Sequence, residues 1–171
     1  MKNRLRTNFA LLAIGWLGMS AILLAAEDAS DLPVEWDSDG PLNVSIEGDI
    51  RIVEMQDNVE VIQGTLLISG DRAIFEYTAD SNELIRVTVH GSPAQYQQES
   101  NNDEFVTGSS ETIILYEDEA TLNTMVEMIG NASIRTPDSV TNCAGIIYDA
   151  DLSIIPNSTP PCSGSFSSAP N

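Results

Sequence analysis

Residues 58–77 read NVEVIQGTLLISGDRAIFEY, and this stretch decides the class of fold. Apolar and polar residues alternate on both sides of Gln63-Gly64, as expected for two half-buried strands joined by a hairpin. Gly70-Asp71 follows as a further turn signal, and 73–77 is expected to form the next strand. The alternating apolar residues of the hairpin are Val59, Val61, Leu66 and Ile68.

The same pattern continues to about residue 155, without an apolar repeat of helical period. Further strands are expected over 84–89, 94–97, 112–116, 121–129, 132–135, 144–148 and 152–155. Between them lie turn signals such as Gly91-Ser92-Pro93, Gly130-Asn131 and Asp149-Ala150-Asp151. About a dozen short strands with this punctuation predict an all-β protein, namely an antiparallel sandwich, jelly roll or barrel.

The composition of the chain excludes several classes of function. The chain has 171 residues, which suits one domain, and its 42% hydrophobic residues are enough for a packed core. Seven basic residues stand against 26 acidic ones, and the formal net charge of −19 argues against nucleic acid as a partner. The single histidine, His90, precedes a Gly-Ser-Pro turn and is interpreted as a turn or strand-end residue. We therefore expect no enzyme, no metal and no cofactor.

The N-terminus is typical of a secretory signal. Residues 1–8 are basic, 9–26 are apolar with small residues at the end, and acidic residues follow. We expect cleavage after Ala26 and a periplasmic protein, with an uncleaved membrane anchor as the alternative. Removal of 1–26 leaves four arginines and 26 acidic residues, which is a net charge of −22.

Export makes a disulfide between Cys143 and Cys162 plausible, because oxidising compartments favour the bond. Two unpaired thiols are the alternative. The bridge would close a loop of about 20 residues, with a contribution of about 3 kcal/mol in the chain-entropy model. Residues 27–156 are expected to form the β-domain, and 157–171, rich in Pro and Ser, a loop-like or disordered tail.

Several segments, in this order and spacing, resemble the LptA/OstA-like family of periplasmic lipopolysaccharide-transport proteins. They are 32–39 (LPVEWDSD), 58–66 (NVEVIQGTL), 91–96 (GSPAQY), 108–116 and 130–132 (GNA). The resemblance covers most of 32–155. It implies a twisted, slightly open antiparallel β-jelly roll that carries lipopolysaccharide from an inner-membrane extraction complex to an outer-membrane translocon.

The hypothesis that follows is an apolar groove that shelters the acyl chains of lipid A. Each buried CH₂ contributes about 0.8 kcal/mol, and non-directional contact permits stepwise transfer. Strand alternation and the resemblance together select the candidate lipid-binding residues. They are Val34, Trp36, Val59, Val61, Leu66, Ile68, Tyr96, Ile114 and Tyr116.

The ends of such a jelly roll would carry unpaired strand edges. The resemblance implies edge-strand pairing with the tethered inner-membrane component, with the translocon, or head to tail with further copies of the chain. We expect these edges at 32–36 and 144–155. Three alternatives stay open: a membrane-tethered member of the family, a β-domain that binds polysaccharide through its acidic loops and calcium, and a structural spacer with a filled interior.

Overall fold

The structure is a computed structural model that describes residues 33–99 and 104–167, and the expected signal segment 1–26 lies outside them. The described residues form one sheet of ten antiparallel strands. The strands are β1 (Glu35–Asp37), β2 (Leu42–Glu47), β3 (Ile50–Gln63), β4 (Leu66–Thr78), β5 (Leu84–Glu99), β6 (Phe105–Glu117), β7 (Thr124–Thr136), β8 (Ser139–Asp149), β9 (Ile154–Thr159) and β10 (Ser163–Phe166). No helix in this part of the chain has the length and apolar character needed to cross a membrane.

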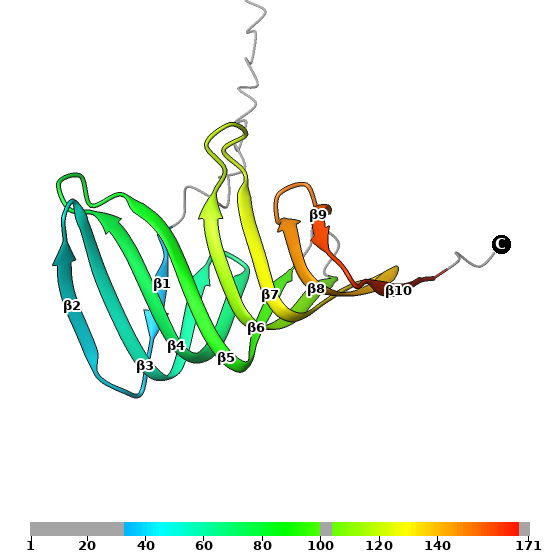
Figure 1. The fold of residues 1–171 in the computed structure, drawn as a ribbon, viewed down its shortest axis with the longest axis horizontal. Helices are drawn as coiled ribbons and strands as arrows, with labels where there is room; N and C mark the ends of the chain where they lie inside the picture. The colour runs from blue at the N-terminus through cyan, green and yellow to red at the C-terminus, as the bar shows by residue number, and fades with distance from the viewer. Residues whose placement is uncertain (1–32, 100–103, 168–171) are drawn as a thin grey trace, which may run out of the picture.

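The six long strands β3 to β8 pair in chain order, and each bends near its middle (Figure 1). The bends coincide with register shifts, for example between Gln56 and Val59 in β3 and between His90 and Ala94 in β5. A bulge bends its strand and increases the local twist. Because the bends lie side by side across the sheet, they form one common corner, and the sheet folds back on itself.

The corner divides the sheet into two layers. Layer A contains β2, β9 and residues 50–56, 72–78, 84–90, 112–117, 124–129 and 145–149. Layer B contains β1, β10 and residues 59–63, 66–69, 94–99, 105–109, 132–136 and 139–143. The layers are joined along the corner and face each other like the sides of a trough.

Local chemistry explains where the strands bend. Asp57 and Asn58 both have positive φ, as do Gly130 and Asn131 in β7. Asn, Asp and Gly tolerate this region better than other residues. At Gly70 the reason is space, because a Cβ would lie 2.6 Å from the carbonyl oxygen of His90.

Two sequence predictions are wrong at this level. Gly70-Asp71, Gly91-Ser92-Pro93 and Gly130-Asn131 were expected to separate strands, but each lies inside one long strand at the corner. The tail from residue 157 was expected to be a loop, whereas its first part completes β9 and β10 forms beyond it. Both strands pair with β8. This pairing holds them in a regular structure that the composition alone did not indicate.

The core lies between the two layers and comes from the inward-facing residue of each alternating pair. Phe75 and Val87 of layer A and Ile68 and Ile134 of layer B are almost completely buried. The phase of alternation changes at the corner in several strands. In β6, for instance, Val106 and Ser110 face inward before the corner, but Ile113 and Leu115 face inward after it.

Candidate functional site

Five of the predicted lipid-binding residues lie together on the inner face of layer B. Each is at most 4% exposed, so in this structure they pack against other side chains. A lipid tail that enters the trough would replace these contacts, because hydrophobic packing is non-directional. The five are Val59, Val61, Leu66, Ile68 and Tyr96.

An aromatic pair joins the two layers. Tyr96 of layer B meets Tyr148 of layer A edge to face, with ring centroids 6.0 Å apart. The Tyr96 hydroxyl donates a hydrogen bond of 2.6 Å to Oε1 of Gln98. Burial raises the pKa of Tyr96 far above its ordinary value, and the nearby Tyr148 and Asp151 raise it further. Both phenols therefore stay neutral, and the pair bridges the two layers.

The phenol oxygen of Tyr148 is buried and has no hydrogen-bond partner among the described residues. Burial raises the pKa of this phenol, while the nearby Ser153 hydroxyl lowers it and Asp149 raises it. A buried hydroxyl without a partner lowers stability, because its desolvation is not compensated.

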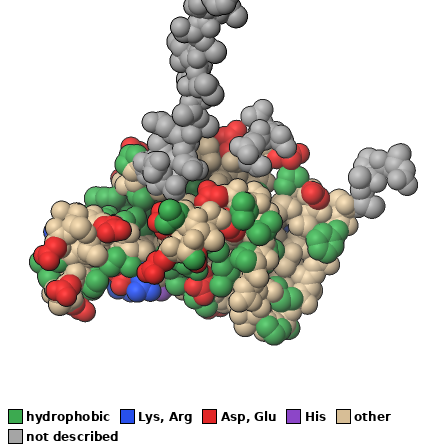
Figure 2. All heavy atoms as spheres, turned by 90° about the horizontal axis from the view of Figure 1, so that it is seen from above, with side chains coloured by type: hydrophobic (Ala, Val, Ile, Leu, Met, Phe, Trp, Pro, Cys, Tyr) green, Lys and Arg blue, Asp and Glu red, His purple; other side chains and the backbone are tan. Residues whose placement is uncertain are grey.

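The mouth of the trough on the side of β3 to β6 contains a hollow of about 290 Å³. Val34, which was predicted to bind lipid, lines it together with Tyr77, Leu84 and Leu115. Gln63 and Thr124 add polar groups at the rim. Sequence reasoning missed Leu84 and Leu115, because alternation does not show which strand ends meet at the mouth. Seen from above, apolar side chains lie among acidic ones on this side of the molecule (Figure 2).

The prediction of which β6 residues face the trough is wrong by one position. Ile113 and Leu115 are buried, so Ile114 lies on the outer face, where it is paired with Thr88 and Glu127. The bulge between Ser109 and Thr112 causes the error. Alternation counted from Val106 without a bulge predicts that even-numbered residues, and so Ile114, face inward. Tyr116 has the same outward phase, yet it lies at the rim of the mouth hollow.

The N-terminal end of the trough has an exposed apolar inner surface. Trp36 is paired with the buried Val61, which places its side chain on the inner face, and it is 46% exposed. Three residues of β2 continue this surface, since they pair with Met55, Val53 and Arg51 of β3. They are Leu42, Val44 and Ile46, and all three are exposed. Strict alternation in LNVSIE was the available signal, which sequence reasoning missed.

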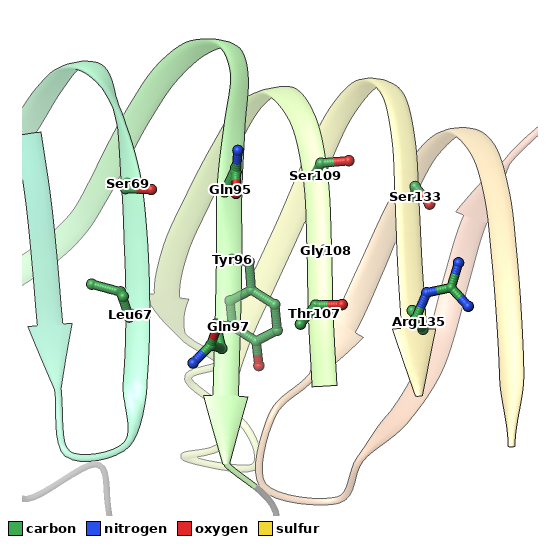
Figure 3. A pocket seen from close by; sticks show the side chains of 10 residues that line it. All are labelled: Leu67, Ser69, Gln95, Tyr96, Gln97, Thr107, Gly108, Ser109, Ser133 and Arg135. Atoms are coloured by element: carbon green, nitrogen blue, oxygen red, sulfur yellow. The ribbon is translucent and has the colours of Figure 1, made fainter. Parts of the chain in front are cut away.

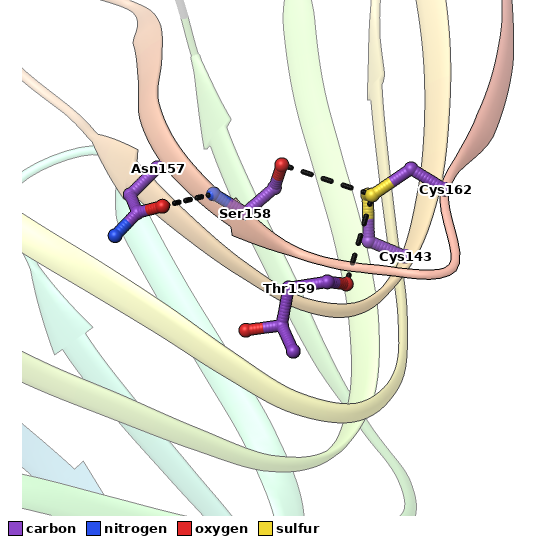
Figure 4. The surroundings of a disulfide bond; sticks show 5 residues. All are labelled: Cys143, Asn157, Ser158, Thr159 and Cys162. Carbon is purple, nitrogen blue, oxygen red and sulfur yellow. Dashed lines mark hydrogen bonds between the residues drawn. A yellow bond between two sulfur atoms is a disulfide. The ribbon is translucent and has the colours of Figure 1, made fainter.

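The C-terminal end is different. Cys143 and Cys162 form the predicted disulfide, which ties the connection between β9 and β10 to β8 (Figure 4). The strands at this end carry mostly polar residues, among them Asn157, Ser158 and Thr159. The prediction of an edge at 144–155 was wrong in part, because β9 and β10 cover β8 on its outer side.

His90, Asp149 and Asp151, which the sequence singles out as possible catalytic or calcium-binding groups, are engaged in structural hydrogen bonds. His90 Nδ1 is 3.0 Å from the Thr112 hydroxyl oxygen. Asp149 accepts hydrogen bonds from the Asn123 amide and from the backbone of the turn after β8, and Asp151 accepts one from the backbone N–H of Thr124. Among the described residues, no group of three or more His, Cys, Asp or Glu is placed to hold a metal ion.

A ten-stranded sheet folded into an apolar trough, with an exposed apolar surface at one end, is the architecture of a β-jelly-roll binding protein. Residues 43–153 match the model of the family described as LptA/(LptD N-terminal domain) LPS transport protein. The match covers more than half of the chain, and the chain belongs to this family.

Two similar proteins agree with this assignment. The lipopolysaccharide export system protein LptA of Haemophilus influenzae is 26% identical over 131 residues, which are 76% of this chain and 72% of that protein. The crystal structure of LptH, described as the LptA-homologous periplasmic component of the lipopolysaccharide transport device of Pseudomonas aeruginosa, has a TM-score of 0.64. It is 17% identical, and the match covers 82% of this chain and 99% of that chain, so the likeness shows a common fold.

Proposed function

We propose that the chain is a periplasmic carrier that shelters the acyl chains of lipopolysaccharide in its trough and passes the lipid from the inner to the outer membrane. The observation that carries this proposal is the apolar inner face, which runs from the buried core to the exposed surface at β1 and β2. The family assignment supplies the class of cargo. The role is transport, with no catalytic step.

Entry begins where apolar surface is accessible. The hollow beside Val34 and Leu84 and the inner face of β2 are open, whereas the interior beside Phe75 is filled. Acyl chains first occupy the open parts and enter more deeply only when the two layers separate. Each CH₂ removed from water stabilises the complex by about 0.8 kcal/mol, and no single contact is strong enough to trap the lipid.

The headgroup lies outside the trough. Phosphate groups on the headgroup face a chain with 26 acidic residues, which repels anions at long range. Affinity therefore comes from the tails.

The strand edges hold the partners. One edge of the sheet is formed by β1 and β2 and the other by β9 and β10. An exposed strand edge can add a further strand from a neighbouring chain. We propose that the two edges pair head to tail with further copies, with the inner-membrane extraction complex and with the outer-membrane translocon.

Photo-crosslinking tests the carrier function. A photoreactive residue at Trp36 or Leu84 should form adducts with lipopolysaccharide, because both positions face the trough. A photoreactive residue at Ile114, on the outer face of layer A, is the matched control and should form none. Adducts at position 114 alone, or at none of the three positions, would overturn the proposal.

A further inference from the structure

A second hollow lies on the outer face of layer B, away from the trough. It has a volume of about 300 Å³ and extends across β4, β5, β6 and β7 (Figure 3). Its polar side chains point away from the core, since they alternate with buried residues such as Ile68 and Ile134. They are Ser69, Gln95, Gln97, Thr107, Ser109 and Ser133, with Arg135 at one side.

The strand register brings these side chains together. Ser69 is paired with Gln95, Gln95 with Ser109, and Ser109 with Ser133, which forms one row across four strands. Thr107 is paired with Gln97 on one side and with Arg135 on the other, which forms a second row. The hollow is therefore built from regular sheet, and its shape does not depend on a loop.

Arg135 differs from the other arginines of the described chain. Arg72 pairs with Glu54 at 2.8 Å, Arg86 pairs with Glu76, and Arg51 donates to the side chain of Asn82. Arg135 has no ion pair or hydrogen bond within the described residues, and the same is true of the six hydroxyl and amide side chains around it. Seven polar groups thus face one hollow with their bonding capacity unused by the protein.

The charged and polar groups around the hollow indicate which class of ligand it can bind. Among the described residues no carboxylate lines this hollow, although the outer face of layer A carries Glu54, Glu76 and Glu127. A guanidinium binds carboxylate or phosphate through two parallel hydrogen bonds. Hydroxyl and amide groups both donate and accept, which matches a ring with several hydroxyls.

We propose that this hollow binds an anionic sugar, in which a phosphate or carboxylate meets Arg135 and the ring hydroxyls meet Gln95, Ser109 and Ser133. The sugar comes either from the headgroup of lipopolysaccharide or from another glycan of the envelope. The site needs no acyl chain, so its test is independent of the carrier function.

The test is an NMR titration of the purified protein with glucose 1-phosphate, with glucose and inorganic phosphate as comparison ligands. Glucose 1-phosphate should shift the amide resonances of Gln95, Ser109, Ser133 and Arg135 and should bind more tightly than either comparison ligand. Failure to shift these resonances at millimolar concentrations would overturn the proposal. Equal affinity for glucose 1-phosphate and inorganic phosphate would overturn its sugar component.

Variants separate the parts of the site. Arg135→Gln should weaken binding of glucose 1-phosphate by about tenfold or more, and Arg135→Lys by less, because lysine keeps the charge but loses the planar fork. Arg86→Gln is the matched control and should leave the affinity unchanged, since Arg86 is paired with Glu76 on layer A. Equal loss in Arg135→Gln and Arg86→Gln would show a general charge effect and no site.

The source of the sugar follows from a last comparison. Weaker binding of whole lipopolysaccharide by Arg135→Gln would assign the site to the headgroup. Unchanged binding of lipopolysaccharide, with binding of glucose 1-phosphate lost, would assign it to another anionic glycan. Either result supports a site at Arg135, and neither depends on adducts in the trough.

Discussion

The two ends of the trough are built from the same kind of edge strands but expose different chemistry. At the N-terminal end, β2 presents Leu42, Val44 and Ile46 on the inner face, and no described residue covers these exposed side chains. At the C-terminal end, the edge strands are mostly polar, with Ile154 and Phe166 as their exposed apolar side chains, and a disulfide fastens their connection to β8. The difference teaches that one end is suited to receive an apolar partner, while the other is held in place covalently.

The mouth of the trough shows the same contrast. The N-terminal side has a hollow lined by Val34 and Leu84. On the C-terminal side, Tyr96 and Tyr148 bridge the two layers, and the turn after β8 is tied down through the carboxylate of Asp149. The N-terminal side is therefore the more accessible to lipid.

Removal of the disulfide is expected to have the largest effect on stability and to increase local opening mainly at the C-terminal end. The double variant Cys143→Ala, Cys162→Ala should lose about 3 kcal/mol of unfolding free energy, because residues 19 positions apart are no longer linked in the unfolded chain. Urea unfolding measures the loss. Hydrogen exchange should accelerate in β9 and β10 but not in β2, and equal acceleration at both ends would remove the contrast between them.

A charge on the apolar N-terminal surface should weaken association between copies. Leu42→Lys should reduce self-association by about tenfold, because the lysine must be desolvated when a partner covers the inner face. Ile129→Lys is the matched control, since Ile129 is 43% exposed against 42% for Leu42 but lies on the outer face. Sedimentation at several concentrations measures both, and equal behaviour of the two variants would contradict an N-terminal docking surface.

The aromatic pair should respond unequally to loss of its two hydroxyls. Tyr96→Phe removes the hydrogen bond to Gln98 and should lower the unfolding free energy by about 1 kcal/mol. Tyr148→Phe removes a buried hydroxyl without a partner and should leave stability unchanged or raise it by about 1 kcal/mol. Urea midpoints provide the measurement. A loss in Tyr148→Phe as large as that in Tyr96→Phe would mean that this phenol is bonded in solution.

Much of the candidate site could be predicted, but its extent could not. Val59, Val61, Leu66, Ile68 and Tyr96 follow from alternation together with the family resemblance, and all five lie in the core. Ile114 was misplaced because the bulge before it changes the phase. A bulge depends on pairing with neighbouring strands, so its position does not follow from the composition of one strand.

The amino-acid sequence by itself determined the all-β class, the alternating apolar face and the pair of cysteines, because these depend on local period and residue type. Only the tertiary structure decided that Gly70-Asp71 and Gly130-Asn131 are corners within strands rather than turns between them. The physical reason is that a turn and a bulge use the same residues and the same backbone conformations. Which of the two forms depends on strand partners that are distant in the sequence, and these partners also decide which end of the trough stays open.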